Sequence, residues 1–464
     1  MEKTNSKKGL IGLGIAILLV VLALLMPVPE GTTRQGLMSL GLFLGTIIMW
    51  ICDTMPMLIT AFLVMFIFPI LGVMDLSTVF TSFGGTAFFF AIATFAISIA
   101  LEKTSVPLRI CYALTRGAKG NSKTLVIGIM FACAITSGFM SNLSSCIIYL
   151  SLSLALLKAN GCQPGNSNLG RCLMIGIPAM AGCGGMITPA GTPGNALIIG
   201  ILAEQGINLS FLQWTAIFAP LALICCLISS LTLTAVFKPE EIGETAIKEL
   251  ETRLKECGTL KAQEKKTLGI ILVILVLWIL GTWIPAFNVT VVAMVGMAIM
   301  FLPGINILDW DTDSKRINWN LAFTIGSVGV LIGALTSSGI VNWMVGGLFS
   351  HLGNMNLYLM LFVTGLVVCI IRAFIPTAPA IVALFAPVLL PLASMTAATP
   401  TALMVLPAFW ACTPLLLWIE PIYLFSYGNG YYTPGQLLKW GWIPSLIMSV
   451  ILAFVPLYLH MFGL

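Results

Sequence analysis

Long apolar runs separated by short polar segments occupy most of the chain from residue 10 onwards. A helix that crosses a bilayer needs about 20 apolar residues. The first run, 10–26, follows three lysines and stops at Pro27-Val28-Pro29 with no small-residue cleavage site after it, so we interpret it as a retained helix and not as a signal peptide. Ten more crossings are predicted at 36–52, 56–74, 83–104, 172–203, 212–237, 267–285, 288–303, 319–344, 402–427 and 441–462.

Two other apolar stretches, 124–157 and 357–395, are too long for a single crossing. Small or helix-breaking residues interrupt each of them near its middle. We therefore predict two re-entrant hairpins, each of which enters the bilayer and returns to the same side.

The composition supports a membrane protein. Of the 464 residues, 59% are hydrophobic and only 8% are charged, whereas a soluble domain carries roughly a quarter charged residues. Soluble, secreted disulfide-rich and disordered proteins are thus excluded. The two histidines lie far apart and the twelve cysteines show no zinc-binding spacing. Neither a catalytic or metal centre nor a nucleic-acid partner is expected, so we predict that the protein is not an enzyme.

The basic residues indicate an orientation. If both long stretches return to their own side, all of the 22 lysines and arginines except Arg34 and Arg372 fall on one face. The positive-inside rule makes that face cytoplasmic. We therefore predict an all-α polytopic protein of the inner (cytoplasmic) membrane, with eleven crossings, two hairpins and a cytoplasmic N-terminus.

The sequence also predicts an internal repeat, in which two halves of the chain share the same arrangement of elements. Residue matches recur at an offset of 234 positions, and the matching pairs are Pro69 and Pro303, Asp75 and Asp309, Phe89 and Phe323, and Leu101 and Leu335. We predict an N-terminal helix (1–35), a first repeat (36–237), a charged cytoplasmic connector helix (238–266) and a second repeat (267–464). Each repeat holds five crossings and one hairpin, and this odd number inverts the second copy. Inverted repeats with interrupted helices are typical of secondary transporters.

Two interrupted segments in the first repeat, 136–145 and 182–195, are candidates for a binding site. Non-helical backbone at membrane depth is tolerated only inside protein or beside a water-filled cavity. Carbonyl oxygens freed at such breaks suit a hard cation such as sodium, and helix N-termini favour an anion. A simple packing kink at the glycine-rich segment is the alternative.

The pairing of Ser141-Asn142 at a hairpin tip with Gly191-Thr192-Pro193-Gly194-Asn195 in a broken helix resembles the divalent anion:sodium symporter (DASS) family. The resemblance implies import of di- or tricarboxylates such as succinate, malate, fumarate or citrate, with sodium as the coupling ion and no other cofactor. It also implies a homodimer in which a transport domain moves against a scaffold domain like an elevator. The sodium ligands implied are Ser137, Ser141, Asn142 and Gly191. The predicted substrate-binding residues are Ser141, Asn142, Leu143, Ser144, Thr192, Pro193, Asn195, Arg372, Thr377, Ala378, Pro379, Glu420 and Tyr423.

The chain departs from the family pattern in several places. Leu143 replaces a hydroxyl residue at the first tip, where Ser144 could substitute for it. The second tip reads Thr377-Ala378-Pro379 and has no amide side chain. The second break reads Glu420-Pro421-Ile422-Tyr423, where Tyr423 takes the place of an asparagine and is expected to line the pocket.

Arg372 and Glu420 are the ionisable residues deep in the predicted membrane region, and we predict that they pair with each other or contact substrate. In one hypothesis Arg372 supplies the charge of a second sodium ion and Glu420 is its partner or a proton-coupling group. In another, Arg372 binds a substrate carboxylate; a purely structural ion pair is the third. A sodium-independent anion exchanger and a proton-coupled carboxylate or sulfate transporter are therefore the alternative functions.

Overall fold

The computed structural model describes residues 6–463 except 119, 244–251, 253, 254, 256, 257, 342, 345–354, 376 and 417–419. Within these residues every regular element is a helix, so the all-α prediction is confirmed. The middle of the predicted connector helix within 238–266, residues 244–251, 253, 254, 256 and 257, lies outside the described residues.

The helices of the first part of the chain are α1 (Ser6–Leu25), α2 (Arg34–Ile51), α3 (Met57–Ile70), α4 (Leu76–Phe83), α5 (Thr86–Glu102), α6 (Val106–Thr115), α7 (Ser122–Ser137), α8 (Asn142–Ala159), α9 (Asn168–Gly185), α10 (Pro193–Glu204) and α11 (Phe211–Phe237). Those of the second part are α13 (Ala262–Leu280), α14 (Val289–Met300), α15 (Trp310–Asp313), α16 (Trp319–Ser337), α18 (Leu357–Arg372), α19 (Ala378–Leu392), α20 (Pro400–Cys412), α21 (Pro421–Tyr427), α22 (Pro434–Ala453) and α23 (Val455–His460). Two short 3₁₀ turns, Pro285–Phe287 and Ser314–Arg316, complete the described elements.

Seven described helical segments are long and apolar enough to cross a bilayer, namely Lys7–Leu25, Arg34–Ile51, Leu76–Glu102, Asn142–Ala159, Phe211–Phe237, Trp319–Ser337 and Pro434–Ala453. The predicted crossings 172–203 and 402–427 each consist of two helices, α9 with α10 and α20 with α21, with α10 and α21 beginning within the predicted breaks. Proline stands at the first position of both α10 and α21. Its missing N–H is tolerated there, but proline in the interior of a helix would remove a hydrogen bond and clash with the preceding turn, so a continuous helix through these positions is disfavoured.

The helix α1 carries large apolar side chains that are exposed in the described part of the chain. Leu10 is 66% exposed and Leu25 is 77% exposed, which suits a surface covered by lipid chains. Arg34 at the start of α2 donates through Nη1 to the carbonyl oxygens of Ala23, Leu24 and Met26 at 2.8–2.9 Å. It therefore satisfies carbonyl groups that the end of α1 leaves without an intrahelical donor.

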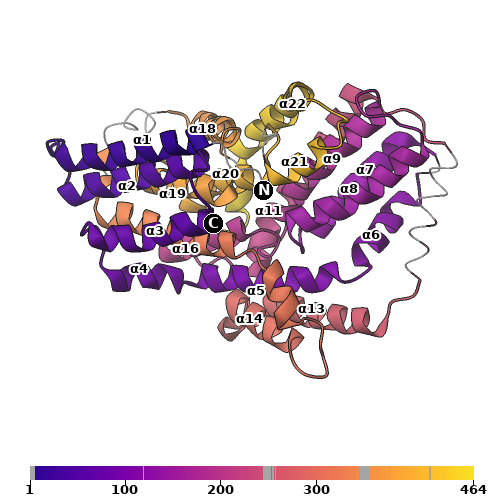
Figure 1. Cartoon of the computed structure of the whole chain (residues 1–464), viewed down its shortest axis with the longest axis horizontal. Helices are drawn as coiled ribbons and strands as arrows, with labels where there is room; N and C mark the ends of the chain where they lie inside the picture. The colour runs from indigo at the N-terminus through magenta and orange to yellow at the C-terminus, as the bar shows by residue number, and fades with distance from the viewer. Residues whose placement is uncertain are drawn as a thin grey trace.

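Both hairpins are present. The arms α7 and α8 lie side by side next to α9, to the right in Figure 1, whereas α18 and α19 lie to the left with α20 and α21 between the two hairpins. The first hairpin turns between Ser137 and Asn142, and in the second the arms end at Arg372 and begin again at Ala378. These turns bring hairpin tips towards the broken helices.

One local feature recurs at the 234-residue offset of the predicted repeat. Asp75 caps the N-terminus of α4 by accepting a hydrogen bond from the Thr78 N–H at 2.9 Å. Asp309, 234 positions later, caps α15 in the same way with the Thr312 N–H at 3.0 Å. The long helices α5 and α16 follow these caps in the two halves, so the order of elements recurs along the chain.

The hairpin arm α7 and the helix α9 approach each other closely because glycines stand at their contact. A Cβ atom added to Gly184 would overlap the carbonyl oxygen of Ala134 in α7. One added to Gly176 would lie 2.8 Å from the Sδ and Cε atoms of Met130. The two helices are therefore in backbone contact near the hairpin tip, and no larger residue fits at Gly184.

Candidate functional site

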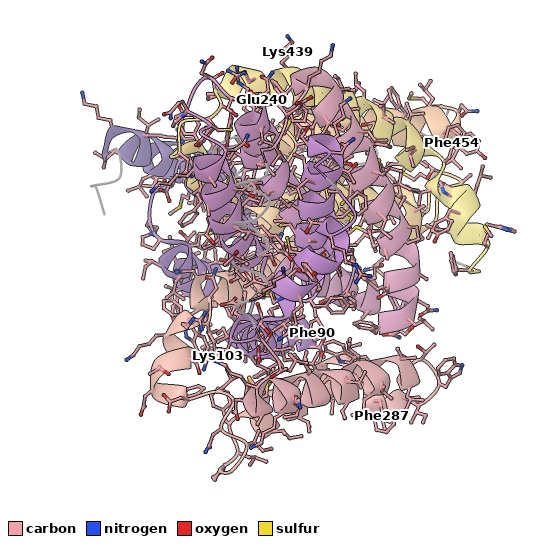
Figure 2. The ribbon with its side chains drawn as sticks, turned by 90° about the vertical axis from the view of Figure 1, so that its right-hand side faces the viewer. Phe90, Lys103, Glu240, Phe287, Lys439 and Phe454 are labelled. Carbon is pink, nitrogen blue, oxygen red and sulfur yellow. The ribbon has the colours of Figure 1, made fainter. Side chains whose placement is uncertain are left out.

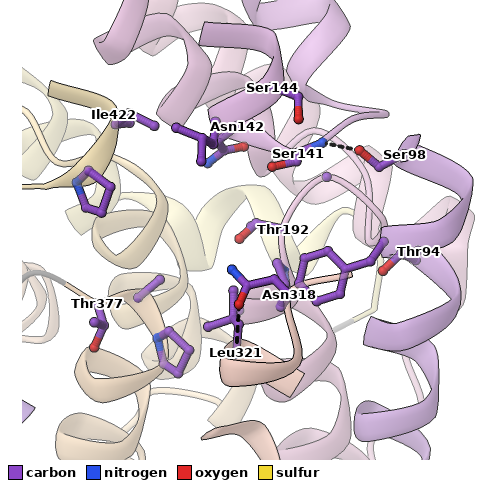
Figure 3. A pocket seen from close by; sticks show the side chains of 18 of the residues that line it. Thr94, Ser98, Ser141, Asn142, Ser144, Thr192, Asn318, Leu321, Thr377 and Ile422 are labelled. Atoms are coloured by element: carbon purple, nitrogen blue, oxygen red, sulfur yellow. Dashed lines mark hydrogen bonds between the residues drawn. The ribbon is translucent and has the colours of Figure 1, made fainter. Parts of the chain in front are cut away.

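A cavity of about 600 Å³ lies where the two hairpin tips, the two helix breaks and the helices α5 and α16 meet (Figure 3). Its polar lining comes from both halves of the chain. The residues of this polar lining are Thr94, Ser98, Glu102, Ser141, Asn142, Ser144, Thr192, Arg316, Asn318, Asn320, Thr377 and Glu420.

The first hairpin tip is held by its own polar groups. The Ser137 hydroxyl, at the end of α7, lies 2.8 Å from the Asn142 Oδ1 atom and 2.7 Å from the Ala181 carbonyl oxygen. Ser141 occupies the N-cap position of α8 without capping the helix through its side chain. Ser141, Asn142, Leu143 and Ser144 all line the cavity.

The break between α9 and α10 is organised by a buried asparagine. The Asn195 side chain is fully buried, and its Nδ2 atom donates to the carbonyl oxygens of Gly185 at 2.9 Å and Thr188 at 2.8 Å. The Thr188 hydroxyl in turn donates to the Gly138 carbonyl oxygen at 2.5 Å. Asn195 therefore stabilises the backbone of the break through these hydrogen bonds, and it is not among the residues that line the cavity.

Oxygen atoms converge between this tip and this break. A Cβ atom added to Gly191 would overlap the Gly185 carbonyl oxygen and lie 3.0 Å from the Ser137 carbonyl oxygen. One added to Gly185 would lie 2.9 Å from the Cγ atom of Asn142 and would overlap its Oδ1 atom. Carbonyl and amide oxygens without a nearby cationic side chain are the ligands that a hard cation prefers. We call this region, formed by Ser137, Ser141, Asn142, Gly185 and Gly191, the first half-site.

The second hairpin tip faces the same cavity from the other side. Thr377, Ala378 and Pro379 line it. In the described part of the chain, the buried Thr377 hydroxyl has no hydrogen-bond partner. Figure 3 shows Thr377 across the cavity from the labelled side chains of the first tip. An unpaired hydroxyl beside a cavity can form a hydrogen bond to a ligand at little energetic penalty, because the hydroxyl has already lost its hydrogen bonds to water in the folded protein.

Arg372 and Glu420 form the predicted ion pair, with 2.7 Å between Nη2 and Oε2. Glu420 lines the cavity, whereas Arg372 is only 1% exposed and lies behind it. Direct contact between Arg372 and a ligand in the cavity is therefore blocked in this conformation. The residues Arg372, Ala378 and Glu420, together with Thr377, form what we call the second half-site.

The expectation that Tyr423 lines the pocket is wrong. Its side chain is fully buried, and the residues of α21 that line the cavity are Pro421 and Ile422. Tyr423 is the third residue of α21, so its side chain projects from a different face of this short helix than that of Ile422. Its carbonyl oxygen accepts a hydrogen bond from the Tyr432 hydroxyl at 3.1 Å.

One wall of the cavity was missed by sequence reasoning. Ser98 of α5 accepts a hydrogen bond from the Ser141 N–H at 2.7 Å (Figure 3). Thr94 lies one helical turn earlier on the same helix, and Asn318 caps α16 on the neighbouring wall. The available signal was the four-residue spacing of Thr94 and Ser98 inside an otherwise apolar helix, which places both on one face.

Ion pairs link the two halves of the chain beside this wall. Arg316 pairs with Glu102 at the rim of the cavity. The Lys103 Nζ atom lies 2.5 Å from Asp313 Oδ2. Burial raises the pKa of Asp313, but hydrogen bonds from Lys103 and the Asp309 N–H more than offset it, so this pKa lies below its usual value. Asp313 is thus a fixed anion that ties the turn before α16 to the end of α5.

Glu240 fastens the segment after α11 to the start of α9. Its carboxylate accepts hydrogen bonds from the N–H groups of Asn168 and Leu169, at the edge of the molecule shown in Figure 2. Burial raises the pKa of Glu240, but these two N–H donors outweigh it and hold the pKa below its usual value. A carboxylate at a helix N-terminus is also favoured by the helix dipole.

Helices that break at a shared cavity within a bundle of bilayer-length apolar helices define a membrane transporter of the secondary type and not an enzyme. The chain belongs to the family described as the sodium:sulfate symporter transmembrane region, whose model matches residues 7–463. The predicted relationship to the DASS family is thereby confirmed.

Two curated relatives carry the name sodium-dependent dicarboxylate transporter SdcS. The one from Staphylococcus saprophyticus is 24% identical, with 99% of this chain and 92% of the relative covered. The one from Staphylococcus aureus strain USA300 is 25% identical, with 98% and 92% covered. The similarity therefore extends over nearly the whole of both chains.

Two solved structures are similar in fold. MtrF of Neisseria gonorrhoeae, described within a class of antimetabolite efflux pumps, gives a TM-score of 0.59 at 14% identity and covers 96% of this chain and 94% of its own. The YdaH transporter of Alcanivorax borkumensis gives a TM-score of 0.57 at 14% identity and covers 96% and 97%. At this identity the likeness concerns the fold alone.

Proposed function

We propose that this protein imports dicarboxylates such as succinate, malate or fumarate, or the tricarboxylate citrate, together with sodium. The convergence of carbonyl and amide oxygens between Asn142, Gly185 and Gly191 carries the proposal. Sodium would bind there, with Ser137, Ser141, Asn142 and Gly191 as its ligands. The printed names of the SdcS relatives support the same ion and the same class of substrate.

A carboxylate substrate would bind in the adjoining cavity. The helices α8, α10 and α19 all begin there, since Asn142, Pro193 and Ala378 are their first residues and line the cavity. Helix N-termini attract anions through their free N–H groups and their dipoles. The hydroxyl groups of Ser144, Thr192 and Thr377 would donate further hydrogen bonds to the substrate.

Transport would follow an elevator mechanism of alternating access. The hairpins and broken helices would move as the transport domain against a scaffold that contains α5 and α16. The hydrogen bond between the Ser98 hydroxyl and the Ser141 N–H lies at that boundary and would break when the domain moves. We further propose a homodimer in the inner membrane with a cytoplasmic N-terminus.

A sodium-independent exchanger, or a proton-coupled carboxylate or sulfate transporter, is the second candidate. The observation in its favour is the second half-site, where Ala378 offers no side-chain oxygen and Arg372 places a guanidinium. With fewer oxygen ligands, coupling to sodium would be weaker than in a transporter with two complete half-sites.

Uptake of radiolabelled succinate into proteoliposomes tests the proposal. We expect uptake to depend on an inward sodium gradient and to fall to background when choline replaces sodium. Asn142→Ala should abolish most of the uptake, because it removes an oxygen ligand of the ion. Asn429→Ala is the matched control, since this asparagine lies at the end of α21 away from the cavity. Equal uptake in sodium and in choline would contradict sodium coupling and favour the second candidate.

A further inference from the structure

The internal repeat allows the two half-sites to be compared position by position. Ser137 is the last residue of the hairpin arm α7, and Arg372 is the last residue of the equivalent arm α18. Ser141 is the N-cap of α8, and Thr377 is the N-cap of α19. The guanidinium therefore stands where the first half-site has a hydroxyl next to the proposed sodium ligands.

The broken helices correspond in the same way. Thr192 is the N-cap of α10 and is followed by Pro193. Glu420 is the N-cap of α21 and is followed by Pro421. A neutral hydroxyl in the first half-site is thus matched by a carboxylate in the second.

The Arg372 side chain makes the contacts that a cation would make at this place. Its Nη1 atom donates to the Ile375 carbonyl oxygen at the hairpin tip, at 2.5 Å. Its Nε and Nη2 atoms each lie 3.3 Å from the Ala411 carbonyl oxygen at the end of α20. Its Nη2 atom also donates to Glu420 at 2.7 Å. The guanidinium therefore joins the hairpin tip to both sides of the break.

Among the described residues, the second half-site offers fewer oxygen ligands to a second sodium ion than the first half-site does. The carbonyl oxygens of Ile375 and Ala411 accept hydrogen bonds from a positively charged guanidinium, whereas the donors in the first half-site are neutral, and Ala378 has no amide oxygen where the first half-site has Asn142. A cation placed here would also lie beside a permanent positive charge, since arginine stays protonated in proteins.

We infer that Arg372 is a built-in cation that replaces a sodium ion in the second half-site, so that only the first half-site carries a coupling sodium ion. The inference rests on the proposed function of the cavity. Glu420 compensates the buried charge, because an unpaired guanidinium in this setting is strongly unfavourable. The second half-site therefore stays assembled whether or not the first is occupied.

Simultaneous uptake of radiolabelled sodium and succinate into proteoliposomes counts the coupled ions in the wild-type protein. We expect one sodium ion per succinate and a sodium activation curve with a Hill coefficient of about 1, since the coefficient is limited by the number of sites. A ratio of two or more would overturn the inference while leaving sodium-coupled transport intact. Absence of any sodium-dependent uptake would contradict the proposed function, and the next test would then decide the inference.

Arg372→Gln tests the replacement without requiring transport. The change frees the two carbonyl oxygens beside the Glu420 carboxylate and should create a cation site. We expect sodium, relative to potassium, to raise the melting temperature of Arg372→Gln by more than that of the wild type, because a ligand that binds only the folded state stabilises it. In the double variant Arg372→Gln with Glu420→Gln, the sodium-dependent increase should return to the wild-type value.

A folded Arg372→Gln protein with the wild-type response to sodium would overturn the inference. If this variant does not fold, the ion count in the wild type decides.

Discussion

Replacement of Asn195 by alanine gives a direct measure of what holds the first helix break together. The Nδ2 atom of this fully buried side chain is the donor to two carbonyl oxygens, those of Gly185 at 2.9 Å and Thr188 at 2.8 Å. A buried polar group that loses its partner costs about 1–3 kcal/mol, so Asn195→Ala should lower the free energy of unfolding by roughly 2–6 kcal/mol. Such a loss is large compared with the whole stability of a typical domain.

Asn429→Ala is the matched control for this prediction. The Nδ2 atom of Asn429 also donates to two carbonyl oxygens, of Phe425 at 2.9 Å and Ser426 at 3.3 Å, but at a site that water reaches. Water can replace these bonds, so the change should stay within about 0.5 kcal/mol. Thermal and denaturant unfolding of the purified variants in detergent measure both effects. Equal stability of the two variants would refute the conclusion that the hydrogen bonds of Asn195 hold the break between α9 and α10 together.

Three further predictions concern single contacts, each measured by thermal unfolding. Thr188→Val, which leaves the Gly138 carbonyl oxygen without its donor, should cost about 1–3 kcal/mol, whereas Thr188→Ser should be close to wild type. Asp313→Asn should cost about 1–2 kcal/mol through loss of the bond from Lys103, and a value that increases with added salt would contradict this cause. Glu240→Gln should lower the melting temperature at pH 7. Because the folded-state pKa of Glu240 is depressed, ionised Glu240 stabilises the protein above its unfolded-state pKa of about 4.3, and the difference from wild type should shrink as the pH falls through the folded-state pKa.

The sequence was sufficient to predict the features that depend on the length of apolar segments and on the position of charged residues. Uninterrupted apolar length predicted the helical class, and the doubled apolar length of 124–157 predicted the first hairpin, because α7 and α8 together exceed one crossing. The pairing of Arg372 with Glu420 followed from the high energy of an isolated charge at membrane depth and is confirmed by their 2.7 Å contact.

Features that depend on side-chain direction could not be predicted. Tyr423 and Ile422 are neighbours in the sequence, yet only Ile422 reaches the cavity. Ser98 was missed because a serine in an apolar helix more often bonds to its own backbone than across to another element.

The close approach of Gly184 to the Ala134 carbonyl oxygen has a consequence for natural variation and for motion. Position 184 excludes every side chain, so in related chains that keep this contact we expect glycine there regardless of the substrate carried. The helices α7 and α9 cannot slide past each other without losing this backbone contact. In the proposed elevator motion the two helices would therefore move together, and the distances between their oxygen atoms would be preserved, so that ion binding and ion movement would be separate physical events.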